Sequence, residues 1–163
     1  MTETDLSQTL WIAVTEILEK MFFIDPSEIE DDGSDSKIPA DRGGLTAHLN
    51  FDGDPPGWLR LRLTRDVASS LAADFLGEDE SELAERKVEG VACELANMIC
   101  GSVLSRVEST TDFRLAAPEI TSPDVVPPRP AICSRTVPLR GGLLSVEMAM
   151  ENIAWPASVK PVS

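Results

Sequence analysis

A long stretch with helical periodicity, residues 79–107, constrains the fold of this chain more than any other feature. At about 100° per residue, its apolar side chains fall within one arc, as in a helix that lies on a core. These side chains are Val88, Ala92, Leu95, Ala96, Ile99, Val103 and Val107. The pattern therefore predicts a helix that covers the hydrophobic core.

The opposite side of this helix carries a narrow stripe of polar and small residues. The stripe consists of Gly90, Glu94, Asn97, Gly101, Ser105 and Glu108. Glu94 and Asn97 are three residues apart, so their side chains point the same way, one turn displaced. An interior glycine costs a helix about 1 kcal/mol relative to alanine, and here a glycine stands on each side of the polar pair. Two interpretations are open: an ordinary solvated face, or a surface cleared for the close approach of another molecule.

Two further helices are predicted around this one. Apolar residues at helical spacing indicate a helix over residues 5–23. A shorter helix over residues 66–76 is expected to end at Gly77, because glycine is the usual residue just past a helix C-terminus. Asp79 and Glu82 resemble a capping box, so the long helix is expected to begin there.

Strand patterns fill most of the remaining chain. They lie at residues 45–51, 58–63, 113–120, 131–137 and 143–150. The first two alternate in polarity on either side of a Gly- and Pro-containing turn, which predicts an antiparallel hairpin. Residues 25–43 are acidic and rich in Ser, Gly and Pro, which indicates a loop. The whole pattern predicts one domain over residues 1–163 with an α/β (α+β) fold, in which an antiparallel sheet packs against long helices.

Charge and cysteine content narrow the possible partners and the compartment. The net charge of -14 would repel a phosphate backbone, so no nucleic acid partner is expected. No apolar run approaches the roughly 20 residues of a membrane span, and no basic N-terminal signal region is present. Cys93 and Cys100 would lie about 10 Å apart along one helix, beyond disulfide reach. A reduced, cytoplasmic protein that does not bind membranes is expected.

The sequence lacks the common catalytic motifs. It contains no His-Glu-x-x-His, Cys-x-x-Cys, P-loop or Gly-x-Ser-x-Gly pattern. His48, the one histidine, lies on a predicted strand and is interpreted as a partly buried structural residue. Arg60 and Arg62 share one strand face and are expected to extend along the sheet surface. A hydrolase of this kind would have to use chemistry that its substrate supplies.

The run from Glu94 to Asn97, continued by Met98, Ile99 and Gly101, resembles the signature helix of the CheC/CheX/FliY family of chemotaxis phosphatases, and its CheX type most. The family pattern is Glu-x-x-Asn on a long helix. CheC-type members carry two such helices, and a single convincing one favours the CheX type.

The resemblance covers most of the chain, but its specific part spans only residues 88–118. A proline follows the family's helix at some distance, a place that Pro118 or Pro123 can fill. One departure stands at Gly90, where the family often has Asp or Ser.

The resemblance implies a phosphatase that acts on the phospho-aspartate of a CheY-type response regulator. Such a regulator already holds a divalent metal and a lysine beside its phospho-aspartate, so hydrolysis needs only a water placed in line with the scissile bond. The resemblance implies that Asn97 orients this water and that Glu94 pairs with the regulator's lysine. A carboxamide suits the first role, because it accepts from and donates to a water without titrating. Magnesium would belong to the partner, and no cofactor is expected on this chain.

Three neighbours of the pair are candidate partner-binding residues. Gly90 and Gly101 would let the helix backbone approach the partner, and Met98 is either partner-contacting surface or core packing. The resemblance also implies a homodimer formed through sheet edges.

Two alternatives to catalysis are open. One is a non-catalytic module of the same fold that binds a response regulator or dimerises, which the departure at Gly90 favours. The other is an acidic adaptor, which would leave the pair of Glu94 and Asn97 unexplained.

Overall fold

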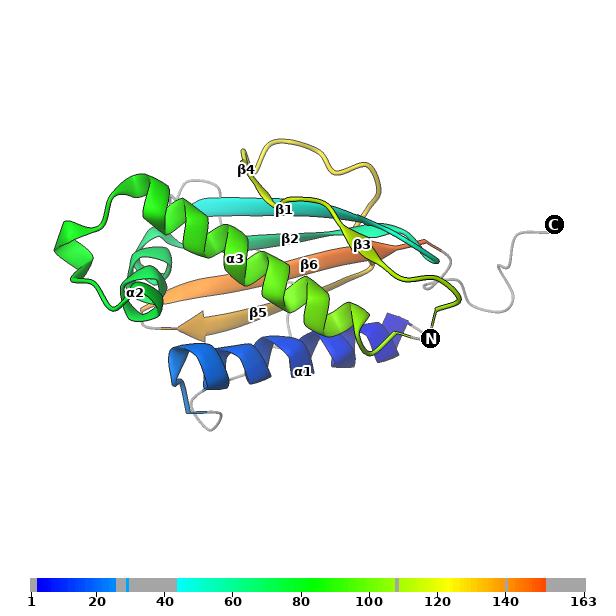
Figure 1. The fold of residues 1–163 in the computed structure, drawn as a ribbon, viewed down its shortest axis with the longest axis horizontal. Coiled ribbons are helices and arrows are strands. Elements are labelled where there is room, and N and C mark those ends of the chain that lie inside the picture. Colours follow the sequence, from blue (N-terminus) through cyan, green and yellow to red (C-terminus); the bar gives the residue numbers. More distant parts are fainter. Residues whose placement is uncertain (1–2, 26–28, 30–43, 108, 140, 152–163) are drawn as a thin grey trace.

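The computed structural model describes residues 3–25, 29, 44–107, 109–139 and 141–151, so most of the loop expected over residues 25–43 lies outside the described residues. The elements in chain order are α1 (Glu3–Phe22), β1 (Leu45–Asp52), β2 (Gly57–Leu63), α2 (Arg65–Leu76), the 3-10 helix η3 (Glu80–Glu82), α3 (Glu85–Leu104), β3 (Arg114–Leu115), β4 (Glu119–Thr121), β5 (Cys133–Leu139) and β6 (Gly142–Met150). They form the α+β fold that the sequence predicts (Figure 1).

The strands form one antiparallel sheet in the order β3-β1-β2-β6-β5, and β4 also pairs with β1. The predicted hairpin is confirmed, with Leu45 opposite Leu63 and Phe51 opposite Gly57. The single strand expected over residues 113–120 is wrong, because two short strands stand there with Pro118 between them. Proline has no N–H to donate to a ladder, so it separates β3 from β4.

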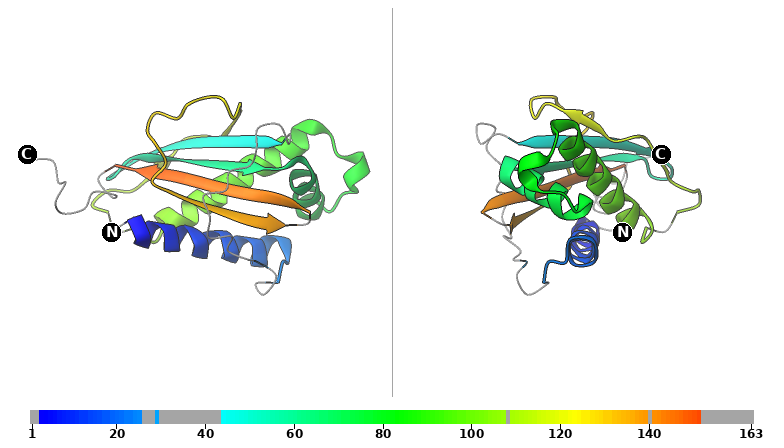
Figure 2. Two further views of the ribbon diagram at one scale, coloured as in Figure 1. Left: turned by 180° about the vertical axis from the view of Figure 1, so that it is seen from behind. Right: turned by 60° about the vertical axis from the view of Figure 1, so that its left-hand side comes forward.

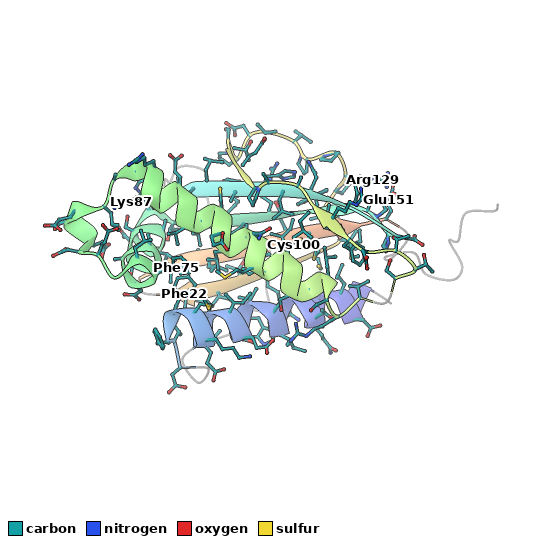
Figure 3. All side chains as sticks on the ribbon, in the orientation of Figure 1. Phe22, Phe75, Lys87, Cys100, Arg129 and Glu151 are labelled. Atoms are coloured by element: carbon teal, nitrogen blue, oxygen red, sulfur yellow. The ribbon has the colours of Figure 1, made fainter. Side chains whose placement is uncertain are left out.

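One face of the sheet is apolar and carries the helices. Alternate residues of β1, such as Leu49, belong to the core. The residues between them, such as His48, point to the other face of the sheet. The long helix α3 lies across β1 and β2, α1 runs beside β5, and α2 packs near β6 (Figures 1 and 2). The rings of Phe22 and Phe75 join α1 to α2, with centroids 5.9 Å apart (Figure 3).

The ends of the helices follow local chemistry. α2 ends at Gly77, whose φ of +66° is the left-handed conformation expected of a glycine cap. Asp79 caps the 3-10 helix η3 and not α3. Its carboxylate accepts a hydrogen bond from the Ser81 N–H. The prediction that α3 begins at residue 79 is therefore wrong. Leu83 has an extended backbone and packs its side chain against the core, which breaks the helix before Glu85.

The polar face of the sheet is crossed by the chain that joins β4 to β5 (Figure 2). Arg60 donates from Nη1 to the Val125 carbonyl oxygen at 2.7 Å, and Trp58 donates from Nε1 to the Arg129 carbonyl oxygen at 3.1 Å. Arg60 is therefore only 4% exposed, and the expectation that it extends along an open sheet surface is wrong. The covering segment comes from a distant part of the sequence, which strand periodicity does not reveal.

Candidate functional site

The exposed side of α3 carries the polar and glycine residues that the sequence singles out. We call Gly90, Glu94, Asn97, Gly101 and Ser105 the α3 stripe; Glu108 lies outside the described residues. Glu94 is exposed and Asn97 is half-buried. The opposite side of the helix is fully buried in the core, at Leu95, Ala96, Ile99 and Val103. The structure thus places both candidate catalytic side chains on one outward-facing surface.

Neither glycine of the stripe is required by packing or by backbone conformation. A Cβ built at Gly90 or at Gly101 would meet no neighbouring atom within 4 Å. Both have negative φ, unlike Gly77. Gly57 is different, because a Cβ there would collide with the Ala149 carbonyl group. On the solvated-face interpretation the two stripe glycines are tolerated because packing stabilises the helix, whereas the close approach of a second molecule would give both a purpose.

The two polar side chains of the stripe are available to another molecule. Within the described residues, the side chains of Glu94 and Asn97 form no hydrogen bond or ion pair. Two charges near the start of α3 are paired instead, because Glu85 bonds to Arg65 and Lys87 lies 2.8 Å from a carboxylate oxygen of Glu78. The Glu94 carboxylate is therefore a free negative charge beside a free carboxamide.

Met98 and Cys93 lie beside the α3 stripe, and both side chains are half-buried. Met98 is half-buried and packs against the core, so the packing interpretation accounts for much of its side chain. Burial, and then the negative charge of Glu89, raise the pKa of the half-buried Cys93 thiol. Burial raises the pKa of Cys100 to about 12. Neither thiol is activated as a nucleophile, because the thiolate is the reactive form.

Two further findings concern the part of the chain that the structure describes. There, no three His, Cys, Asp or Glu side chains gather closely enough to hold a metal ion. None of the helices in the same part combines the length and the apolar character needed to span a bilayer.

A hollow of about 490 Å³ continues the stripe at the C-terminal end of α3. Its near wall includes Gly101 and Ser105, and its far wall is the segment of residues 109–115. That segment is placed by pairing with β1, since Leu115 lies opposite Phe51. Sequence reasoning missed this hollow because helical periodicity describes only its near wall.

A larger cavity, of about 1300 Å³, lies away from α3, under the segment that crosses the polar face of the sheet. Three of the four arginines that line it have partners among the described residues. Arg60 is bonded to Val125, Arg129 pairs with Glu151 (Figure 3), and Arg135 donates to the Ser7 carbonyl oxygen. The contacts of Arg60 and Arg129 tether the segment to the sheet, so the α3 stripe is the better candidate site.

Comparisons with known proteins identify the family and the fold. The family model described as chemotaxis phosphatase CheX matches residues 45–126, which include the whole of α3. No curated protein sequence matches the chain.

Solved structures share the fold at low sequence identity. The chemotaxis protein CheX from Vibrio vulnificus has a TM-score of 0.69 and 18% identity, covering 93% of this chain and 99% of its own. CheX from Desulfovibrio desulfuricans has a TM-score of 0.69 and 19% identity, with 90% and 99% covered. The CheX-CheY-BeF3-Mg complex from Borrelia burgdorferi gives a TM-score of 0.69 and 17% identity, with 88% and 96% covered.

Proposed function

The chain belongs to the CheX family, and from this premise we propose that it accelerates hydrolysis of the phospho-aspartate of a CheY-type response regulator. One observation carries the proposal: a free carboxamide and a free carboxylate stand between two glycines that the fold itself does not need. A protein surface that approaches the helix closely would use all four residues. Neither Cys93 nor Cys100 is an activated thiol, and in the proposed reaction the electrophile and the metal come with the substrate.

In this proposal Asn97 positions the attacking water. Its Oδ1 accepts a hydrogen bond from the water and its Nδ2 donates to an oxygen in the site, so the water's free lone pair points at phosphorus. The water oxygen bonds to phosphorus as the bond from phosphorus to the aspartate oxygen breaks, which yields inorganic phosphate and a free carboxylate. In such a loose transition state, positioning contributes more than proton removal.

Glu94 would fix the register of the complex. Its carboxylate lies one turn before Asn97 on the same surface, and no cation of the described residues pairs with it. A lysine in the receiver's phosphorylation site would supply the missing positive charge. Such a pair orients two surfaces, and it becomes stronger as the interface excludes water.

The Borrelia relative supports this class of partner. Its structure holds CheX with CheY, BeF3 and magnesium, and beryllofluoride stands in for a phosphoryl group on the receiver. At 17% identity the likeness concerns the fold, so the partner of this chain is part of the proposal.

The decisive test compares phosphate loss from a phosphorylated CheY-type receiver with and without the protein. Asn97→Ala should lower the accelerated rate on the order of a hundredfold, as when one transition-state hydrogen bond is lost. A half-buried helix position accepts alanine, so the fold should persist. Asn50→Ala, the same change on the other face of the sheet, should match the parent. Near-parental activity of Asn97→Ala would refute water positioning, and parental binding without acceleration would identify a non-catalytic module.

We also propose a homodimer formed through sheet edges. Within the described residues, β5 pairs on one side only, with β6. The free backbone groups of such an edge can extend the sheet into a second copy. Light scattering at tens of micromolar should give twice the mass of the chain, and a monomer mass would remove this proposal.

A further inference from the structure

We infer that the hollow at the C-terminal end of α3 receives a loop of the receiver domain, on the side of the phosphoryl group away from the receiver's lysine. This inference rests on the proposed function. It adds a second docking element, the segment of residues 109–115, to the α3 stripe.

The order of residues along α3 sets the direction. Gly101 lies one turn beyond Asn97, about 6 Å along the helix axis, and it is the first residue of the hollow's near wall. Glu94 lies one turn on the other side of Asn97. If Glu94 meets the lysine and Asn97 faces the phosphoryl group, the hollow lies beyond the phosphoryl group.

Receiver architecture supplies something to fill that space. In open α/β sheets of this type, ligand sites lie at the carboxyl ends of the strands and are surrounded by the loops that follow them. With the phospho-aspartate facing Asn97, one of these loops would extend along α3 toward Ser105. The chain after α3 returns to join β1 as β3 and β4 (Figure 1). The loop would enter between α3 and residues 109–115, which line the hollow from its two sides.

The far wall is held in place by contacts within the protein. The ring of Phe113 meets that of Phe51 edge-on, with centroids 6.0 Å apart. A Cβ at Gly53 would fall 2.5 Å from Phe113 Cδ1, so glycine at this position leaves room for the Phe113 ring. Ser109 donates from Oγ to the Asp54 carbonyl oxygen at 2.5 Å. A wall fixed in this way loses little conformational entropy when a partner docks.

The chemistry of the hollow indicates what kind of loop fits. Its floor is apolar, with Leu104 and Leu115, and its rim carries the exposed polar residues Ser105, Thr111 and Asp112. A loop with a small apolar tip would cover the floor. A basic or hydroxyl-bearing neighbour would meet Asp112 at the rim, because charges of opposite sign orient an encounter.

The experiment fills the hollow without touching Glu94 or Asn97. Thr111→Arg puts a long side chain into it, and Ala131→Arg makes the same charge change at an exposed position on the other side of the sheet. Binding is measured with a CheY-type receiver loaded with beryllofluoride and Mg²⁺. The rate of dephosphorylation is measured with the phosphorylated receiver as substrate. Thr111→Arg should weaken binding and raise KM roughly tenfold or more, with kcat little changed. Asp112→Asn should weaken binding severalfold, and Ala131→Arg should behave as the parent.

The outcomes separate this inference from the proposed function. If Thr111→Arg and Asp112→Asn bind like the parent while Asn97→Ala loses turnover, the hollow is empty in the complex and the phosphatase proposal stands. If the parent binds the receiver without accelerating hydrolysis, the binding measurements still decide whether the hollow is used. If the parent neither binds nor accelerates, both conclusions are wrong.

Discussion

Replacing Gly90 or Gly101 by alanine should stabilise the protein. Both lie inside α3, both have negative φ, and an added Cβ meets nothing within 4 Å. Alanine restricts the unfolded chain more than glycine does, so each substitution should add about 1 kcal/mol to the free energy of unfolding. The two sites are about 16 Å apart along the helix, so the double variant should gain about 2 kcal/mol.

Thermal and urea unfolding measure this gain. For a chain of this size, about 1 kcal/mol corresponds to a rise of about 2–4 °C in Tm. Gly77→Ala is the matched control. A Cβ there also meets nothing within 4 Å, but φ is +66°. Alanine at that position should therefore destabilise the protein by about 1 kcal/mol, because only the backbone conformation differs.

The same variants test why the glycines are present. If the partner's backbone approaches α3 closely, Gly90→Ala and Gly101→Ala should raise KM for the phosphorylated receiver while they raise Tm. Leucine at either position should have a larger effect on KM. Stabilised variants with parental KM and kcat, leucine included, would show that the glycines are merely tolerated on a solvated face. If the alanine variants gain no stability, the added Cβ does not project into open space at these positions of α3.

Two further predictions concern charge. Glu94→Gln should weaken binding of the phosphorylated receiver and make the remaining activity less sensitive to salt, since the variant loses an ion pair that salt screens. Rates of receiver dephosphorylation at two ionic strengths measure this effect. Parental rates at both ionic strengths would mean that the α3 stripe is not the docking face. The pKa of His48 is lowered from 6.5, chiefly by burial, although its bond to Asn50 opposes the shift. The unfolded chain therefore binds a proton more readily than the folded one, and stability should fall as pH drops from 6.5 toward the folded pKa. Urea unfolding above and below pH 6.5 should show a smaller change in the free energy of unfolding for His48→Gln than for the parent. If the free energy of unfolding depends on pH equally in both proteins, His48 is not the group responsible.

Local patterns in the sequence predict the parts of the fold that local forces decide. The apolar arc of α3 is confirmed because one continuous helix must bury Leu95, Ile99 and Val103 together. The end of α2 at Gly77 and the antiparallel hairpin of β1 and β2 are also confirmed. Each depends on residues that are near one another in the chain.

The features that sequence reasoning missed depend on contacts between distant segments. The start of α3 is displaced because Leu83 packs against the core instead of continuing a helix from Asp79. Arg60 is buried because the Val125 carbonyl oxygen, from a segment that follows β4, accepts its hydrogen bond. The hollow exists because Leu115 pairs with Phe51 and so brings residues 109–115 back beside α3. No periodicity within one element encodes these placements.

The different burial of the two polar side chains matches the different tasks proposed for them. Asn97 is half-buried and follows Ala96, which has no exposed surface, so core packing fixes the rotation of the helix at this turn. A group that positions a water must be held within about 0.5 Å, which suits a restrained side chain on a rigid helix. Glu94 is exposed and free to move. An ion pair weakens only gradually with distance, so a mobile carboxylate is enough to find a lysine and draw the receiver into register. If the two residues exchanged places along α3, the carboxylate would be restrained and the carboxamide mobile, and we would expect binding to survive better than turnover.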